Sequence, residues 1–211
     1  KKALGQPGRP KQERQKIKRR MARISVWPSG PVTAPAVSRA LALIDFRKEY
    51  AECPVRVELP GSLEARARLE AVRAGIDPDK PLVTAHVRES GYKLSLGLPE
   101  RPTDVMRNAT VARYGPAFRY LISQGFQVVR VGDAWATPVE EPGVIDLARS
   151  PLRTEHLELW CLKRSRFFLA SDSGPYMVAL LLNTPTLAVN VTALVGGDPL
   201  RTGDLYLLKH V

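Results

Sequence analysis

The stretch from Arg166 to Asn190 constrains the fold more than any other part of the sequence, because its pattern predicts a strand, a turn, a helix and a second strand. The apolar runs 167–170 and 186–189 are short enough for buried strands. Between them, Ser-Asp-Ser-Gly-Pro at 171–175 offers helix-capping residues and a proline suited to a first helical turn, so a helix is expected over 177–182. The unit therefore places a polar turn at the carboxyl end of a strand, where open α/β sheets bind phosphate-bearing ligands.

Strands and helices also alternate in the residues before this unit. Apolar runs predict strands over 82–87, 126–131 and 144–145, and helical spacing predicts helices over 62–76, 110–124 and 154–163. The spacing gives two inward-facing sets: Ala65, Leu69, Val72 and Ile76 on the first helix, and Val111, Tyr114, Phe118 and Leu121 on the second. Residues 89–107 are expected to form a long loop. The predicted fold class is α/β, a doubly wound Rossmann-like parallel sheet.

The net charge of +11 is concentrated at the N-terminus. Residues 1–23 hold ten Lys or Arg and one Glu, whereas the other 188 residues hold 22 basic and 20 acidic side chains. We expect 1–23 to be a basic flexible tail that is either merely solvated or able to contact anionic lipid or RNA. Residues 24–61 are a linker or partial N-terminal element, and 62–211 form the Rossmann-like domain.

Composition excludes several classes of protein. Hydrophobic residues make up an ordinary 44%, no apolar run is long enough to span a membrane, and no signal-peptide pattern follows the basic start. Cys53 and Cys161 match no metal-ligand spacing, so reduced thiols and a cytoplasmic location are expected. The nearest pattern to a metal-binding carboxylate pair, Asp77-Pro-Asp79, is better explained as a turn that ends a helix.

Polar side chains follow two further predicted strands. His86 and Arg88 end the strand 82–87 and share one face because side chains alternate along a strand. Arginine offers a planar fork to phosphate oxygens, and histidine can donate a hydrogen bond beside it. After the next strand, Arg130 is followed by a glycine turn that presents Asp133 to a ribose or a base edge. Each strand end alone is more often a surface or salt-bridged feature, but the three together match a nucleoside diphosphate.

Six motifs in one order carry a resemblance to a known family. They are HVRESGY (86–92), RNA (107–109), VVRVGD (128–133), PGVIDLARSPLR (142–153), FFLASDSGPYMVALLLNTPTLAVN (167–190) and DLYLLK (204–209). They resemble a family of bacterial glycosyltransferases found with surface-polysaccharide genes, itself similar to fucosyltransferases whose nucleotide-sugar site begins with an HxR strand end. The resemblance implies a GT-B architecture of two Rossmann-like halves, with this chain matching the C-terminal, donor-binding half.

The resemblance also implies roles for individual residues. Arg88 would be catalytic, binding the donor diphosphate and stabilising its leaving charge, with His86 beside it. Arg130 and Asp133 would contact the nucleotide, Asp133 at the base or ribose. Glu89 is the nearest carboxylate for a general base, or it forms a salt bridge.

The turn after the strand 167–170 is implied to hold the phosphates. Ser171, Ser173 and Gly174 would cradle them, and Asp172 would order the turn or approach the sugar. Tyr176 would stack on a base or sugar, or else pack in the core. Transfer without a metal or other cofactor is expected, because fixed cations and backbone donors stabilise the diphosphate.

The predicted function is transfer of a sugar from a nucleotide-sugar donor to a saccharide or lipid-linked acceptor in surface-polysaccharide synthesis. The alternative is a non-catalytic nucleotide or sugar-phosphate binding module. Nucleic-acid binding is disfavoured, because no RNA-binding motif accompanies the basic tail and aromatic residues make up only 7%. The chain would act in the cytoplasm, peripherally at the inner face of the membrane if the tail binds anionic lipid.

Overall fold

The computed structural model describes residues 51–52, 57–192, 201 and 203–209, all of which belong to one compact unit, residues 41–211. The tail predicted over 1–23, most of the segment 24–61 and Cys53 lie outside the described residues.

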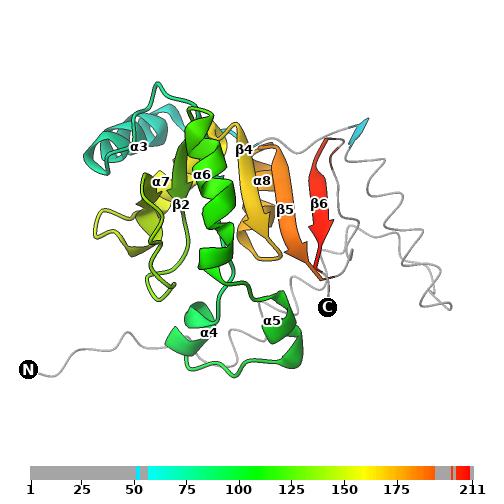
Figure 1. Cartoon of the computed structure of the whole chain (residues 1–211). Coiled ribbons are helices and arrows are strands. Elements are labelled where there is room, and N and C mark those ends of the chain that lie inside the picture. The colour runs from blue at the N-terminus through cyan, green and yellow to red at the C-terminus, as the bar shows by residue number, and fades with distance from the viewer. Residues whose placement is uncertain (1–50, 53–56, 193–200, 202, 210–211) are drawn as a thin grey trace, which may run out of the picture. The chain divides into compact units, whose positions relative to one another are not determined.

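A six-stranded parallel sheet forms the centre of this unit (Figure 1). Its order is β3-β2-β1-β4-β5-β6, with every neighbouring pair parallel. The strands are β1 Leu82–Ala85, β2 Gln127–Arg130, β3 Val144–Asp146, β4 Phe167–Ser171, β5 Thr186–Val191 and β6 Leu205–Leu208. This confirms the predicted α/β class. The strand order reverses between β1 and β4, and a crevice at the carboxyl ends of such strands is the usual ligand site of open parallel sheets.

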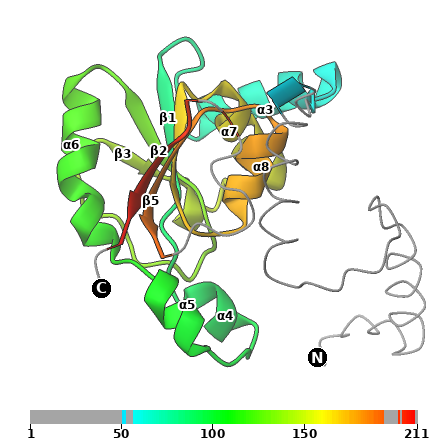
Figure 2. The same ribbon diagram turned by 90° about the vertical axis from the view of Figure 1, so that its right-hand side faces the viewer.

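Helices cover both faces of the sheet, as Figure 2 shows edge-on. One face carries α3 Gly61–Arg73, α7 Glu155–Arg164 and α8 Pro175–Leu181, and the other carries the 3₁₀ helix η1 Val111–Tyr114 and α6 Gly115–Ser123. Alternate strand residues enter two cores: Phe168 and Ala170 face the first, and Leu169 faces the second. Because both faces are buried, the strands read as continuous apolar runs in the sequence.

The predicted inward face of the helix over 110–124 is confirmed. Val111, Tyr114, Phe118 and Leu121 are all buried in the second core. No helix in the described part of the chain is long and apolar enough to cross a membrane.

The predicted inward face of the helix over 62–76 is wrong except at Ile76, which follows α3 and is buried in the first core. Leu69 and Val72 are 64% and 58% exposed and Ala65 is exposed, whereas Ala67 and Ala71 are fully buried in the first core. The reason is that α3 packs against α7, where small side chains let two helices approach closely. The large apolar side chains of α3 therefore lie on its exposed side, and its buried side carries alanines.

The loop predicted over 89–107 contains two short helices, α4 Gly91–Ser95 and α5 Pro102–Arg107. Proline in the first turn and Asp104, whose carboxylate accepts the Arg101 backbone N–H at 3.0 Å, start α5. Figure 1 shows both helices beyond the carboxyl ends of the strands. The segment thereby brings charged side chains to the edge of the sheet where the crevice lies.

The packing of α3 predicts that an alanine-to-leucine substitution destabilises the protein at a buried position of the helix and not at an exposed one. Ala71→Leu should destabilise the protein by about 1–3 kcal/mol, because extra volume in a packed core forces shifts of the surrounding side chains. Ala65→Leu, on the exposed side of the same helix, should change the free energy of unfolding by less than about 0.5 kcal/mol. Urea unfolding of both variants tests this, and equal losses would contradict the packing described above.

Candidate functional site

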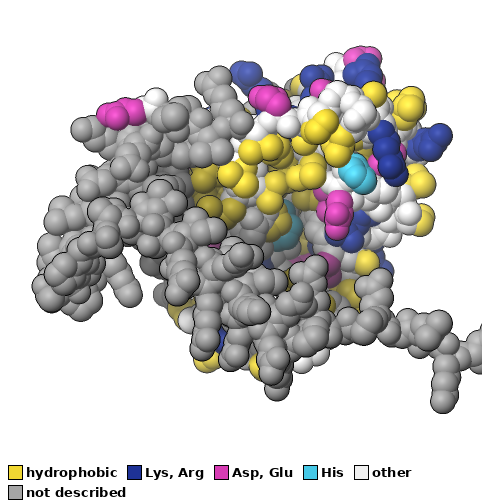
Figure 3. Space-filling view, turned by 180° about the vertical axis from the view of Figure 1, so that it is seen from behind, with side chains coloured by type: hydrophobic (Ala, Val, Ile, Leu, Met, Phe, Trp, Pro, Cys, Tyr) yellow, Lys and Arg dark blue, Asp and Glu magenta, His cyan; other side chains and the backbone are white. Residues whose placement is uncertain are grey.

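A cleft of about 610 Å³ opens at the carboxyl ends of β1, β2 and β4. Its lining comes from the residues after β1 (86–90), from α4, from the turn after β2 (131–133), from α7 and from the turn into α8 with the helix itself (173–175 and 178). Glu100, Asn108 and Arg153 complete it. The volume is in the range typical of small-molecule sites. Figure 3 views the molecule from the side that carries α3, α7 and α8, where apolar side chains form a broad patch bordered by acidic and basic ones. A cavity thus lies at the strand ends where the sequence predicts a site.

The ends of β1 and β4 are joined by hydrogen bonds that continue past β1. The His86 N–H donates to the Leu169 carbonyl at 2.9 Å, and the Ser171 N–H donates to the His86 carbonyl at 3.2 Å. The Arg88 N–H donates to Ser171 Oγ at 2.7 Å. Ser171 is buried and does not line the cleft, which differs from the expected phosphate contact. Its hydroxyl instead fixes the backbone of Arg88.

Arg88 lines the cleft as a cation held by one carboxylate. Its Nη2 pairs with Asp104 Oδ1 at 2.8 Å, and Lys93 Nζ pairs with the other oxygen of the same carboxylate. The Lys93 hydrogen bond and that from the Arg101 N–H lower the pKa of Asp104 to about 2. Burial, with a contribution from Arg107, lowers the pKa of Arg88. One acidic group therefore orients two cleft-lining cations, leaving a net positive charge.

His86 is a neutral group at pH 7, which leaves the hydrogen-bonding role expected for it at this strand end. Burial, and then the nearby charges of Arg130 and Arg88, lower its pKa to about 4 from an ordinary 6.5. The ring lines the cleft, with Nδ1 3.5 Å from Ser171 Oγ. His86 can thus offer a ligand a hydrogen bond but no charge.

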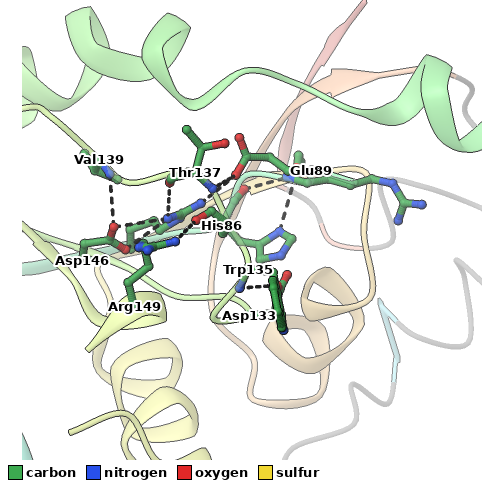
Figure 4. A network of polar contacts seen from close by, with 12 residues as sticks. His86, Glu89, Asp133, Trp135, Thr137, Val139, Asp146 and Arg149 are labelled. Atoms are coloured by element: carbon green, nitrogen blue, oxygen red, sulfur yellow. Dashed lines mark hydrogen bonds and ion pairs between the residues drawn. The ribbon is translucent and has the colours of Figure 1, made fainter. Parts of the chain in front are cut away.

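Arg130 is placed differently from the expectation that it contacts a ligand. Its side chain is 0% exposed and lies between two carboxylates, with Nη2 2.9 Å from Glu89 Oε2 and Nη1 3.1 Å from Asp146 Oδ1. Nη1 also donates to the Thr137 carbonyl at 2.9 Å. Figure 4 shows this network. A guanidinium so enclosed has no surface to present to a ligand, and it supports the cleft only through Glu89, which lines it.

Glu89 lines the cleft but pairs with Arg130 rather than with Arg88. Its Oε2 also accepts the Thr137 N–H at 2.9 Å. Two donors on one oxygen hold the carboxylate in place. The arrangement matches the salt-bridge alternative for Glu89 better than the general base.

The turn into α8 divides its expected residues between the cleft and the interior. Ser173 and Gly174 line the cleft, and Gly174 has an ordinary φ of −50° with open space where a side chain would stand. Asp172 does not line the cleft: its Oδ1 accepts from Arg107 Nη2 at 3.0 Å, so it orders the turn. Tyr176 is buried edge-to-face against Tyr206, with ring centroids 5.9 Å apart, which is the core-packing alternative.

The opposite side of the cleft is acidic and apolar. Asp133 lines it as expected, together with Glu158 of α7, whose Oε1 accepts the Gly132 N–H at 3.2 Å and Arg153 Nε at 2.8 Å. Apolar side chains on this side come from α7 and α8 and include Leu159, Leu162 and Val178. Arg88 and Lys93 therefore form a cationic part of the lining, and Asp133, Glu158 and the apolar side chains form another part, where Arg153 pairs with Glu158. The carboxylates of Glu89 and Glu100 also line the cleft.

Sequence reasoning missed Lys93, Asp104 and Glu158. The signal for Asp104 was present, because proline followed two residues later by aspartate is a helix-start pattern. No local signal marks Lys93 or Glu158, which reach the cleft only through the packing of α4 and α7.

No group of three or more His, Cys, Asp or Glu side chains that could hold a metal ion occurs in the described ranges. Cys161 is a free thiol in the first core, where burial raises its pKa.

Comparison with solved structures identifies proteins of similar fold. A family 9 glycosyl transferase from Veillonella parvula is 14% identical, with 74% of this chain and 43% of that chain covered and a TM-score of 0.52. The ADP-heptose LPS heptosyltransferase II of Escherichia coli is 16% identical, with 72% and 47% covered and a TM-score of 0.47. The chain spans less than half the length of either protein. No protein-family model matches the sequence, and no curated protein matches it.

The lowered pKa of His86 predicts loss of stability in mild acid. Since its pKa is about 4 in the folded protein and about 6.5 unfolded, the unfolded chain takes up the proton first as pH falls below 6.5. This residue should remove about 2 kcal/mol between pH 7 and pH 5, and the loss should level off below pH 4, where the folded state is also protonated. Urea unfolding at pH 7 and pH 5 should show a shallower pH dependence for His86→Gln than for the wild type. Parallel profiles for wild type and His86→Gln would refute the assignment.

Proposed function

We propose that this chain is the donor-binding part of a nucleotide-sugar-dependent glycosyltransferase. The observation that carries the proposal is the position of Arg88, a cation in a cleft beside the point where the strand order reverses, facing carboxylates and an apolar wall. The fold shared with the Veillonella parvula glycosyl transferase supports it. The wider proposal is that the sugar goes to a saccharide or lipid-linked acceptor in surface-polysaccharide synthesis, in the cytoplasm at the inner face of the membrane.

The cationic side of the cleft would bind the diphosphate of the donor. Asp104 engages Nη2 of Arg88 and so orients the guanidinium, which lines the cleft. A guanidinium held in this way would present its planar charge to phosphate oxygens. Lys93 supplies a second positive charge, and Ser173 and Gly174 border the same space.

The acidic and apolar side would bind the nucleoside. Leu159, Leu162 and Val178 offer an apolar surface for the flat face of a base. Asp133 Oδ1 accepts the Trp135 N–H at 2.9 Å, which orients this carboxylate at the cleft for a ribose hydroxyl. His86 would add a neutral hydrogen-bonding group between the two sides.

The proposed reaction breaks the bond between the anomeric carbon and the diphosphate oxygen, while an acceptor hydroxyl oxygen bonds to that carbon and loses its proton. Negative charge develops on the leaving diphosphate, and Arg88 and Lys93 would stabilise it as fixed cations without a metal. Glu89 is given a positioning role, because its Oε2 is held by Arg130 and Thr137.

A nucleotide-binding module without turnover is the second candidate, favoured by the pairing of Glu89, the carboxylate nearest to Arg88 in the sequence, with Arg130. Incubation with nucleotide sugars and saccharide acceptors separates the two candidates. Release of nucleoside diphosphate only when an acceptor is present supports transfer, and binding without release supports the module.

Arg88→Ala should weaken binding of a nucleoside diphosphate about 10- to 100-fold, because a charge-assisted hydrogen bond is lost. Binding of the free nucleoside should change little. Calorimetric titration with ADP, UDP and GDP and their nucleosides measures both, and Arg113→Ala, at an exposed arginine, is the control. Equal weakening for nucleoside and diphosphate would remove Arg88 from the phosphate site.

Gly174→Glu should abolish diphosphate binding while the protein stays folded. The site has open space and ordinary φ, and a negative charge before the first turn of α8 is compatible with the helix dipole. The added carboxylate would repel the phosphates, whereas Gly174→Gln adds similar bulk without the charge. Retained diphosphate binding in the Glu variant, at an unchanged melting temperature, would show that the turn only connects β4 to α8.

A further inference from the structure

Trp135 exposes a large aromatic side chain next to the cleft. Trp135 is 71% exposed, whereas the following residue, Ala136, is 3% exposed. Of the three tryptophans in the sequence, Trp160 is buried in the first core and Trp27 lies outside the described residues. An exposed indole is a ready contact for an apolar ligand surface, because it offers a wide rigid face with few torsions to restrict.

The backbone that carries Trp135 is held from several directions (Figure 4). The Trp135 N–H donates to Asp133 Oδ1, and Arg149 Nη1 donates to the carbonyls on either side, of Ala134 at 3.3 Å and Ala136 at 2.7 Å. Beyond these, Glu89 accepts the Thr137 N–H and Asp146 accepts the Val139 N–H. The indole therefore projects from a fixed loop.

A second exposed aromatic side chain lies on the adjoining segment. Gly91 packs so closely on the Trp135 backbone that a side chain there would stand 2.7 Å from the Trp135 carbonyl oxygen. Tyr92, the next residue, is exposed and lines the cleft, as does Asp133 on the tryptophan loop. Trp135 itself is outside the cleft lining. The two aromatic residues thus stand at the rim, on segments that touch.

We infer that Trp135, with Tyr92, binds a sugar ring of the saccharide acceptor. The inference rests on the proposed function and adds the location of the second substrate. A pyranose ring has an apolar face of C–H groups that can lie on an indole, while its hydroxyls stay in water, which suits a platform exposed at a rim.

The position of Trp135 favours an acceptor sugar over the base of the donor. The cleft already contains an apolar wall for a base in Leu159, Leu162 and Val178, within the same cavity as Arg88. Trp135 lies outside that cavity, where a second substrate would be held as it approaches a sugar on the bound diphosphate.

Saturation-transfer NMR on the full chain tests the inference with two sets of probes: methyl glycosides of glucose, galactose and mannose, and the nucleotides ADP, UDP and GDP. Trp135→Ala should reduce the strongest glycoside signal at least fivefold and leave the nucleotide signals unchanged. Trp135→Phe, which keeps an aromatic ring, should retain part of the glycoside signal. Tyr120→Ala is the matched control, because Tyr120 is 64% exposed on α6 but does not line the cleft.

Three results would overturn the inference: no glycoside signal with the wild type, an unchanged glycoside signal in Trp135→Ala, or loss of nucleotide binding in the same variant. The last result would assign Trp135 to the donor. A different result would contradict the proposed function itself: the absence of any ADP, UDP or GDP signal with the wild type. A glycoside signal that depends on Trp135 would still support a sugar site in that case.

Discussion

The carboxyl edge of this sheet depends on the ion pairs that the buried guanidinium of Arg130 makes with Glu89 and Asp146. Removing such a charge from water is costly unless it is paired and hydrogen-bonded, and here Glu89 and Asp146 both pair with it. The parallel register sets Arg130 beside Ala85 of β1 and Asp146 of β3, so the three strand ends meet around one cation. The two carboxylates also hold the backbone of residues 137–139, so the pairing of Arg130 fixes the loop that flanks the cleft.

A second ion-pair group gives the cleft its polarity. Asp104 draws Arg88 and Lys93 together on one side, while Asp133 and Glu158 line the other. The low pKa of Asp104 keeps this carboxylate charged, and the low pKa of His86 keeps the residue between the two sides neutral. The nucleotide sugar proposed as the donor would place its diphosphate at Arg88 and Lys93, and its base and hydroxyl groups at the other residues of the lining.

Comparison of the predictions with the structure shows where local pattern is informative. The strands, the layered α/β arrangement and the buried face of α6 followed from apolar runs and spacing, because burial on both faces of a parallel sheet leaves a strong signal. The face of α3 was mistaken, since close packing on α7 selects Ala67 and Ala71 over larger side chains. Among the expected ligand contacts, Arg130, Ser171 and Tyr176 are buried, although each stands near a strand end.

The sequence by itself determined that polar residues gather after β1, β2 and β4, because parallel strands bring their carboxyl ends to one edge. It could not determine which of those residues face a ligand. That depended on ion pairs between distant positions, 16 residues apart for Arg88 and Asp104, 41 for Arg130 and Glu89, and 65 for Arg107 and Asp172. Each pairing removes a charged group from the cleft or orients one toward it, and such pairings are decided by packing across the whole domain.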